Sequence, residues 1–215
     1  PFEPGGRYLL TYDNHTSVHG IREFARQRGA EITYLPVMAP ELRVGAEEVE
    51  QELDRGDGGR PRLFAFPAQS NFSGVQHPLE WVARARERGW HVLLDAAAFT
   101  PTNRLDLGAV KPDYVPLSFY KMFGYPTGIG ALVYRHDALR ILRRPWFAGG
   151  TITLASVQSE DWYRMADGYA GFEDGTVDFL GLPAVSIGLE HLASIGIDTI
   201  HERVMALTGW VLDQL

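Results

Sequence analysis

Short runs rich in β-branched and aromatic residues alternate with amphipathic segments along most of the chain. Runs of the first kind predict strands at residues 7–13, 31–37, 63–69, 91–99, 113–121 and 128–135. Segments of the second kind predict helices at residues 16–29, 45–56, 78–89, 136–144, 182–196 and 197–215, with a loop at 57–62. This alternation indicates an α/β domain whose mostly parallel sheet is flanked by helices on both faces.

Charge and hydropathy exclude several classes of partner. The net charge of -7 argues against nucleic acid and against anionic membrane surfaces, because both attract basic proteins. No apolar run approaches the roughly 18–20 residues that cross a bilayer, and no secretory signal is visible. We therefore expect a cytoplasmic protein with no nucleic-acid partner and no membrane partner.

The ends of the chain indicate a part of a longer protein, and its lack of cysteine excludes several kinds of site. The sequence begins at "PFEPGG", without an initiator Met, and ends inside a predicted helix. We expect residues 1–215 to be one domain cut from a longer protein. The chain contains no cysteine, so disulfides, cysteine-ligated zinc and a nucleophilic thiol are excluded within these residues.

Polar side chains follow several of the predicted strands directly. Ligands of open α/β sheets bind beyond the carboxyl ends of the strands, so these side chains are candidates for a common site. They are Asp13, Asn14, His15, Gln69, Ser70, Asn71, Asp95, Ser118 and Lys121.

Lys121 is unusual because it and Lys111 are the only lysines in the chain. It lies in the apolar stretch "SFYKMFG", and desolvation there would lower its pKa and make its amine nucleophilic. A lysine that forms a Schiff base and an aspartate, here Asp95, that pairs with a pyridinium nitrogen are what pyridoxal phosphate requires. The alternative is that Asp95 caps a helix and Lys121 forms a surface ion pair.

The other candidates also admit two interpretations. His15 is either a ring that stacks on a planar cofactor and exchanges protons, or a residue at a helix start capped by Thr16 or Ser17. Asn71 either binds a ligand or forms an Asx turn. Ser118 suits a phosphate oxygen. The nearby "GYPTGIG" matches neither the dinucleotide fingerprint nor the P-loop, which disfavours nucleotides.

Together with later motifs, these residues resemble a known family. The motifs are "PAQSNFSG", "LLDAAAFTPTNRLDL", "VPLSFYKMFGYPTGIGALV", "WFAGGT" and "GFEDGT". They are similar to class V pyridoxal-phosphate enzymes, the cysteine desulfurase-like group of aminotransferase fold type I, and within it to molybdenum cofactor sulfurases. The resemblance covers nearly the whole chain. It implies that residues 1–215 are the large, cofactor-binding domain, with a small C-terminal domain beyond them.

The resemblance implies a role for each matching position. Lys121 would form the Schiff base with pyridoxal 5'-phosphate, Asp95 would pair with the pyridine nitrogen, and His15 would stack on the ring and assist proton transfer. Asn71 would lie near the phenolic oxygen of the cofactor or the substrate carboxylate, and Ser118 would bind phosphate.

Thr176, in "FEDGT", matches a position that reaches the phosphate of the neighbouring subunit's cofactor in cysteine desulfurases. A homodimer with shared active sites is therefore implied.

The sequence departs from the family pattern at two site positions. Desulfurases usually have a glutamine near the phenolic oxygen, but this chain has Ala98 there, and sulfurase-like members also have alanine at this position. Tyr120 replaces a phosphate-binding histidine. The family's upstream phosphate loop would precede residue 1, and its sulfur-accepting cysteine would lie beyond residue 215.

The activity that the resemblance implies is a lyase or sulfurtransferase reaction on L-cysteine, with a molybdenum cofactor or a sulfur-acceptor protein receiving the sulfur. Two alternatives stay open. One is another class V reaction, such as transamination, racemisation or selenocysteine cleavage. The other is a degenerate, non-catalytic homologue retained for dimerisation or scaffolding.

Overall fold

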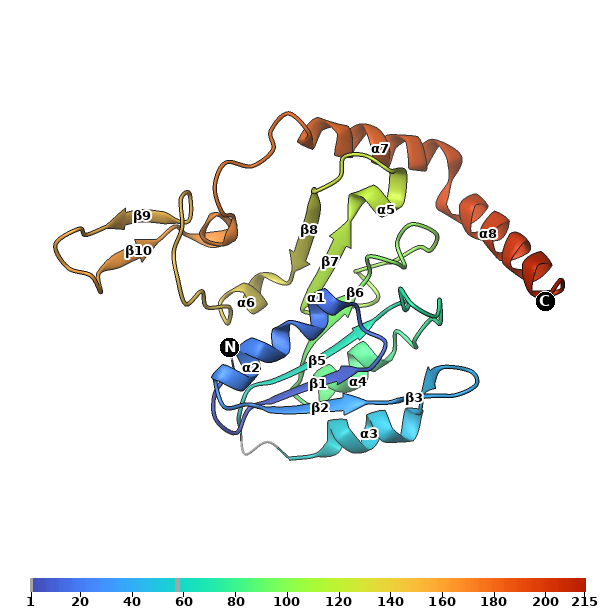
Figure 1. The fold of residues 1–215 in the computed structure, drawn as a ribbon, viewed down its shortest axis with the longest axis horizontal. Helices are drawn as coiled ribbons and strands as arrows, with labels where there is room; N and C mark the ends of the chain where they lie inside the picture. The colour runs from blue at the N-terminus through green and yellow to red at the C-terminus, as the bar shows by residue number, and fades with distance from the viewer. Residues whose placement is uncertain (1, 57–58) are drawn as a thin grey trace.

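The computed structural model describes residues 2–56 and 59–215, so Asp57 and Gly58 of the predicted 57–62 loop lie outside the described residues. Within them, the centre of the fold is a six-stranded sheet in the order β2-β1-β5-β6-β7-β8 (Figure 1). The strands are β1 (Arg7–Thr11), β2 (Glu31–Leu35), β5 (Arg62–Pro67), β6 (His91–Asp95), β7 (Tyr114–Ser118) and β8 (Gly130–Tyr134). All neighbouring pairs are parallel except β7 and β8, so the predicted mostly parallel sheet is confirmed.

The two faces of the sheet carry separate apolar clusters, because successive side chains of a strand point to opposite faces. Phe64 and Phe66 of β5 belong to one cluster, which α3 (Ala46–Asp54) and α4 (Trp81–Glu87) cover. Ala65 belongs to the other, which α1 (Thr16–His19) and α2 (Ile21–Gln27) cover. Helices therefore flank both faces, as the sequence predicts.

The predicted 16–29 helix is interrupted at Gly20, which separates α1 from α2. Its predicted end is correct: Gly29 has a φ of 71°, a left-handed conformation in which a side chain would be strained. A two-stranded ribbon, β3 (Val37–Met38) and β4 (Arg43–Val44), precedes α3.

The strand predicted at 113–121 is wrong over its last residues. β7 ends at Ser118, and Phe119–Phe123 form a short helix, α5. The helix ends where Gly124 adopts a φ of 81°. The glycine after "FYKMF" was the sequence signal for this helix end. Lys121 lies on α5, the helical turn that directly follows β7.

The last third of the chain is less helical than predicted. Of the 136–144 helix, only α6 (His136–Leu139) forms, and an unpredicted hairpin follows, β9 (Ile152–Ala155) with β10 (Tyr163–Met165). A 3-10 turn, η1 (Gly168–Phe172), leads to the predicted final helices α7 (Leu182–Ile195) and α8 (Ile197–Leu212).

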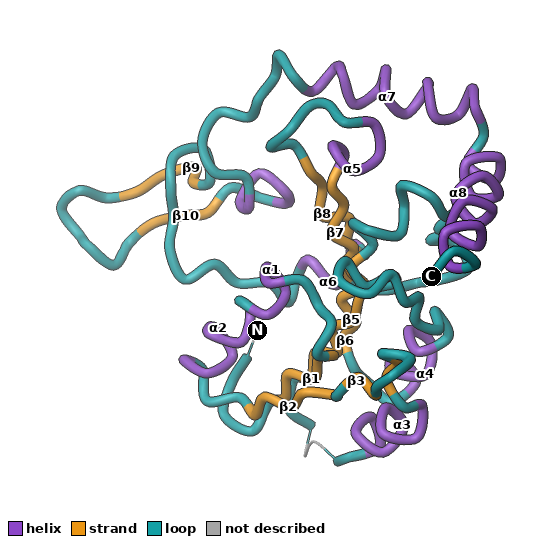
Figure 2. The backbone as a smooth tube through the Cα atoms, turned by 45° about the vertical axis from the view of Figure 1, so that its right-hand side comes forward, coloured by secondary structure: helices purple, strands orange, loops and turns teal. Residues whose placement is uncertain are grey.

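The β9–β10 hairpin extends away from the central sheet in both views of the backbone (Figures 1 and 2), and α8 lies on the side of the fold opposite the hairpin. Many large apolar side chains of the last third of the chain are exposed, and they include Trp162, Phe179, Leu180 and Trp210. In the described part of the chain, no helix has the length and apolarity needed to cross a membrane.

Candidate active site

A cavity of about 260 Å³ lies at the carboxyl ends of the central strands. Side chains from the ends of β1, β5, β6 and β7 meet there because parallel strands finish at the same edge of the sheet. Six of the predicted site residues line this cavity: His15, Asn71, Asp95, Ser118, Tyr120 and Lys121.

Lys121 and Asn71 are in direct contact across the cavity, although 50 residues separate them in the sequence. The Nζ atom of Lys121 donates a hydrogen bond to Oδ1 of Asn71 at 2.8 Å. An ammonium group and an amide oxygen make a strong, charge-assisted hydrogen bond. The lysine amine is thus held at a defined position at the mouth of the cavity.

Asp95 lies deeper in the same cavity, at the last position of β6, and is 7% exposed. Its Oδ1 accepts the N–H of Ala97 at 3.0 Å, which fixes the orientation of the carboxylate. Ala97 and Ala98 also line the cavity. Small side chains next to a buried carboxylate leave room for a flat ligand to approach it.

His15 lies both at the start of a helix and on the cavity. It is itself the N-cap of α1, in place of Thr16 or Ser17, and its Nδ1 accepts the N–H of Ser17 at 3.3 Å. Because Nδ1 accepts a hydrogen bond, the proton of the neutral ring lies on Nε2. The imidazole also lines the cavity, so the cap orients a ring that faces the site.

Helix α5 positions Ser118, Tyr120 and Lys121. Ser118 is the N-cap residue of the helix, but its side chain makes no capping hydrogen bond and its hydroxyl is left for the cavity. On the far side, α5 packs on α7, where a Cβ atom added at Gly188 would overlap the ring of Phe123. The absence of a side chain at Gly188 therefore lets α7 support the helix that carries the lysine.

Three of the polar residues that follow predicted strands point elsewhere. Asp13, Asn14 and Ser70 are buried and do not line the cavity, so the expected convergence of every strand-end side chain is wrong in part. Asn14 donates to the carbonyl oxygens of Thr11 and Ala65 and fastens the end of β1 to β5. Asp13 pairs with His77 at 2.8 Å, a contact that sequence reasoning missed because His77 shows no motif of its own.

Thr176 does not line the cavity. It is exposed in the segment between η1 and α7, next to Gly175, whose N–H donates to the carbonyl of Gly149 at 2.7 Å. Gln69, Ser17 and Pro116 line the cavity as well. Of these, only Gln69 had a sequence signal, its place directly after a strand.

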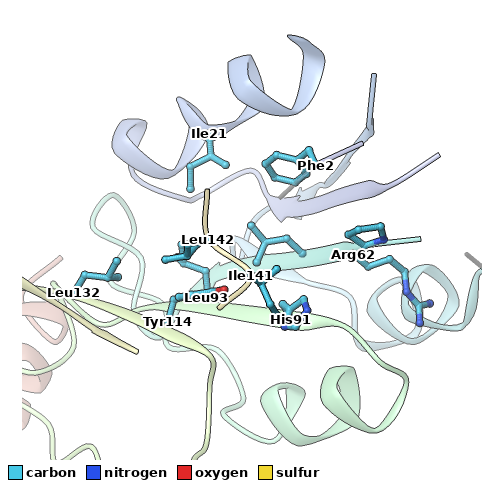
Figure 3. A pocket seen from close by; sticks show the side chains of 11 residues that line it. Phe2, Ile21, Arg62, His91, Leu93, Tyr114, Leu132, Ile141 and Leu142 are labelled. Atoms are coloured by element: carbon cyan, nitrogen blue, oxygen red, sulfur yellow. The ribbon is translucent and has the colours of Figure 1, made fainter. Parts of the chain in front are cut away.

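A second cavity, of about 200 Å³, lies on the sheet face that α2 covers (Figure 3). Ile21 reaches it from the helix, and Leu93 and Tyr114 line it from the strands. His91, its one imidazole, lies 3.8 Å from the carboxylate of Asp113. The exposed lining of this cavity is almost wholly apolar. No cluster of potential metal ligands occurs among residues 2–56 and 59–215.

The family model "Aminotransferase class-V" matches residues 1–215. The chain belongs to this family. Among curated class V relatives, the molybdenum cofactor sulfurase of Homo sapiens is 39% identical over 222 residues, which are 98% of this chain and 24% of the relative. The chain spans between about a quarter and a third of the length of the curated relatives it matches.

Solved structures of the same fold confirm the predicted fold type I architecture. The apo cysteine desulfurase of Thermococcus onnurineus superposes with a TM-score of 0.80 at 22% identity, covering 99% of this chain and 52% of that one. A variant of the cystine C–S lyase, with glycine covalently linked to its pyridoxal-phosphate cofactor, superposes with a TM-score of 0.74 at 22% identity, covering 95% and 53%.

The residues of the cavity fit pyridoxal phosphate chemically. The cavity combines a lysine amine, a buried carboxylate, an imidazole and a serine hydroxyl, and alanines beside the carboxylate leave space for a ring. Groups of these kinds are suited to bind the aldehyde, the ring nitrogen, the ring face and the phosphate of that cofactor.

Proposed function

We propose that the complete protein is a pyridoxal-phosphate enzyme of the molybdenum cofactor sulfurase type that takes the sulfur atom from L-cysteine. The observation that carries this proposal is the meeting of Lys121, Asn71 and Asp95 in one cavity at the carboxyl edge of the sheet. Membership of the class V family and 39% identity to a molybdenum cofactor sulfurase support it.

In this proposal the chain holds the cofactor from several sides. Lys121 would bond to its aldehyde through a Schiff base, the buried Asp95 carboxylate would hold the proton of the ring nitrogen, and His15 would cover the ring face. When bound, pyridoxal phosphate supplies an electron sink for charge that develops at the substrate carbon. Asp95 strengthens that effect because a carboxylate favours the protonated, electron-poor ring.

The remaining residues would orient the cofactor and move protons. Ser118 and Tyr120 would donate hydrogen bonds to the phosphate, and Asn71 would hold the phenolic oxygen or the substrate carboxylate. The amine of Lys121 lines the cavity and would act as the base that carries the proton of the substrate Cα. His15 Nε2 offers a second site for proton transfer.

The sulfur atom of the substrate cysteine would be transferred to an acceptor thiolate. The Cβ–S bond of cysteine breaks, the acceptor thiolate becomes a persulfide, and the remaining carbon skeleton becomes alanine. No cysteine is present in residues 1–215, so that thiolate belongs to another segment or to another molecule. A molybdenum cofactor or a sulfur-acceptor protein would then receive the sulfur.

We further propose that the protein acts as a cytoplasmic homodimer. The exposed apolar side chains of the β9–β10 hairpin and of α7 and α8 would be buried by a second subunit. Thr176 lies in the same region, away from its own cavity, where it would reach the cofactor phosphate of the neighbouring subunit.

Incubation of the complete protein with pyridoxal phosphate, L-cysteine and a thiol reductant tests the proposal. We expect a visible absorption band from lysine-bound cofactor, followed by alanine and sulfide in equal amounts. Formation of a keto acid, of D-amino acid, or of product from selenocysteine alone would indicate another class V reaction. A protein that stayed colourless with the cofactor would be a non-catalytic homologue.

A further inference from the structure

Asp13 and His77 form a buried pair that joins two connections at the carboxyl edge of the sheet. Asp13 lies between β1 and α1, two residues before His15. His77 lies in the connection between β5 and α4, which also carries Asn71. Oδ2 of Asp13 and Nε2 of His77 are 2.8 Å apart, and the two side chains are 3% and 2% exposed. The pair thus links the β1–α1 connection, which carries His15, to the β5–α4 connection, which carries Asn71.

The pair has a defined hydrogen-bonding direction. A carboxylate only accepts hydrogen bonds, so Nε2 of His77 carries the proton. Burial by itself would raise the pKa of Asp13, but the hydrogen bond and the electrostatic attraction of His77, together with hydrogen bonds from Thr11 and the backbone, lower that pKa. The His77 ring stacks on Trp81, with the ring centroids 5.3 Å apart, so its orientation is fixed as well.

The backbone around Asn71 is fastened to the same place. The Ser70 hydroxyl donates to the carbonyl of Asp13 at 3.4 Å and accepts the N–H groups of Phe72 and Ser73, both at 3.3 Å. The His77 N–H donates to the carbonyl of Ala68 at 3.1 Å and closes the 68–77 loop. Asn71 is exposed at the tip of this loop, so its placement depends on the buried residues below it.

We propose that Asp13 and His77 are positioning residues for the candidate site, because their hydrogen bond sets the 68–77 loop and thereby holds Asn71 Oδ1 against Lys121 Nζ. They touch neither cofactor nor substrate and act through Asn71. The consequence for cofactor binding rests on the proposed function, whereas the placement of the loop is a property of the chain alone.

A purely stabilising pair would behave differently, and Leu53 provides the matched control. Leu53 is fully buried in the same apolar cluster as Trp81, but it lies on α3 and does not line the cavity. Leu53→Ala therefore lowers stability without touching the 68–77 loop. His77→Phe keeps a ring to stack on Trp81 and removes only the donor, whereas His77→Gln retains an N–H donor of similar reach.

The test compares these variants in the complete protein by two measurements. The first is hydrogen exchange of the Phe72 and Ser73 amides without cofactor, and the second is the dissociation constant of pyridoxal phosphate from its visible absorption. We expect His77→Phe to speed the exchange and to weaken cofactor binding about tenfold, the size of one lost hydrogen bond to a charged group. His77→Gln should restore part of both, and Leu53→Ala should change neither.

Coupling to Asn71 decides whether the pair acts through that residue. In an Asn71→Ala background, His77→Phe should no longer weaken cofactor binding. An undiminished effect there, or equal effects of His77→Phe and Leu53→Ala on amide exchange, would overturn the proposal.

Two further measurements keep the test decisive. If His77→Phe does not fold, Asp13→Ala, which removes the acceptor for His77, carries the exchange measurement, and exchange as slow as in the parent protein would then contradict the proposal. If the parent protein takes up no cofactor, the proposed function fails, while the exchange rates still decide the positioning role.

Discussion

At the amino edge of the central sheet, charged side chains pair with one another, whereas at the carboxyl edge three groups that can carry charge face a cavity. Arg7 donates to Glu52 at 2.7 Å, and its guanidinium lies 5.4 Å from the ring centroid of Trp90. Asp113, also buried there, accepts the N–H of Val92 at 2.8 Å and lies 3.2 Å from Arg135. At the carboxyl edge, by contrast, His15, Asp95 and Lys121 line the cavity of about 260 Å³.

The difference teaches that residue type alone does not separate stability from function in this fold. Both edges carry buried carboxylates and basic groups. At the amino edge their partners are neighbouring side chains and backbone groups, so their interactions contribute to folding. At the carboxyl edge His15 and Asp95 are held in place by backbone contacts, and their remaining hydrogen-bonding capacity faces the cavity. Mutations at the two edges should therefore change different properties.

The largest effect should come from Lys121→Ala. Removal of the amine that would bond to the cofactor should abolish its visible absorption band and lower turnover at least about a thousandfold, with little change in melting temperature. Lys111→Ala is the matched control, since Lys111 is the only other lysine and lies exposed outside the cavity. An absorption band that survived Lys121→Ala unchanged would contradict the assignment of the lysine.

Trp90→Ala should show the opposite pattern at the amino edge. Trp90 is 2% exposed, donates to the carbonyl of Leu53 at 2.9 Å, and contacts the guanidiniums of Arg7 and Arg62. Its truncation should cost about 3–5 kcal/mol of unfolding free energy. The wavelength of the cofactor band should not move in the protein that stays folded. A shifted band would show that the two edges are coupled, and thermal unfolding with absorption spectra of the same samples measures both.

Asp113→Asn should give a smaller, pH-dependent loss of stability. Burial by itself would raise the pKa of Asp113, but His91, the N–H of Val92 and Arg135 together lower that pKa below its usual value. The ionised form therefore stabilises the fold at any pH above the unfolded pKa of about 3.9, and this contribution is lost as pH falls through the folded pKa.

The Asp113→Asn variant should accordingly lose about 1–3 kcal/mol at neutral pH. The gap between its melting temperature and that of the parent protein should shrink below about pH 4. A gap that stayed constant down to acid pH would show that the charge of Asp113 does not stabilise the fold.

The smallest effect should come from the ion pair of Arg104 with Asp198, which belongs to neither edge. The atoms are 2.8 Å apart, but the side chains are 67% and 71% exposed, and solvent and salt screen such pairs. Arg104→Ala should leave both the melting temperature at physiological salt and the cofactor band unchanged. A clear loss of stability would mean that the contact of α8 with the rest of the domain depends on this pair.

Much of the fold and of the site could be predicted from the sequence. The strands of the sheet, the glycine after α2 and six residues that line the cavity follow from patterns of a few residues each. The family match confirms the resemblance that the motifs around Lys121 indicated. The roles of the individual site residues stay predictions until the cofactor is tested.

Other features had weaker local signals. The β9–β10 hairpin has strands of four and three residues, too short for a clear alternation, and α5 is a helix of five residues that continues an apolar strand. Periodicity needs several repeats before it separates a strand from a helix. The one local signal for α5 was Gly124, which marks the end of that helix.

The chemical groups at the strand ends can be read from short stretches of sequence, because side-chain alternation and turn residues act over a few positions. The direction in which each group points depends on contacts that form in the folded chain. Asp13 and His15 are two residues apart, yet Asp13 turns inward to His77 while His15 faces the cavity. The partner that makes this choice lies 64 residues away, and contacts across such a distance leave no periodic trace in the sequence.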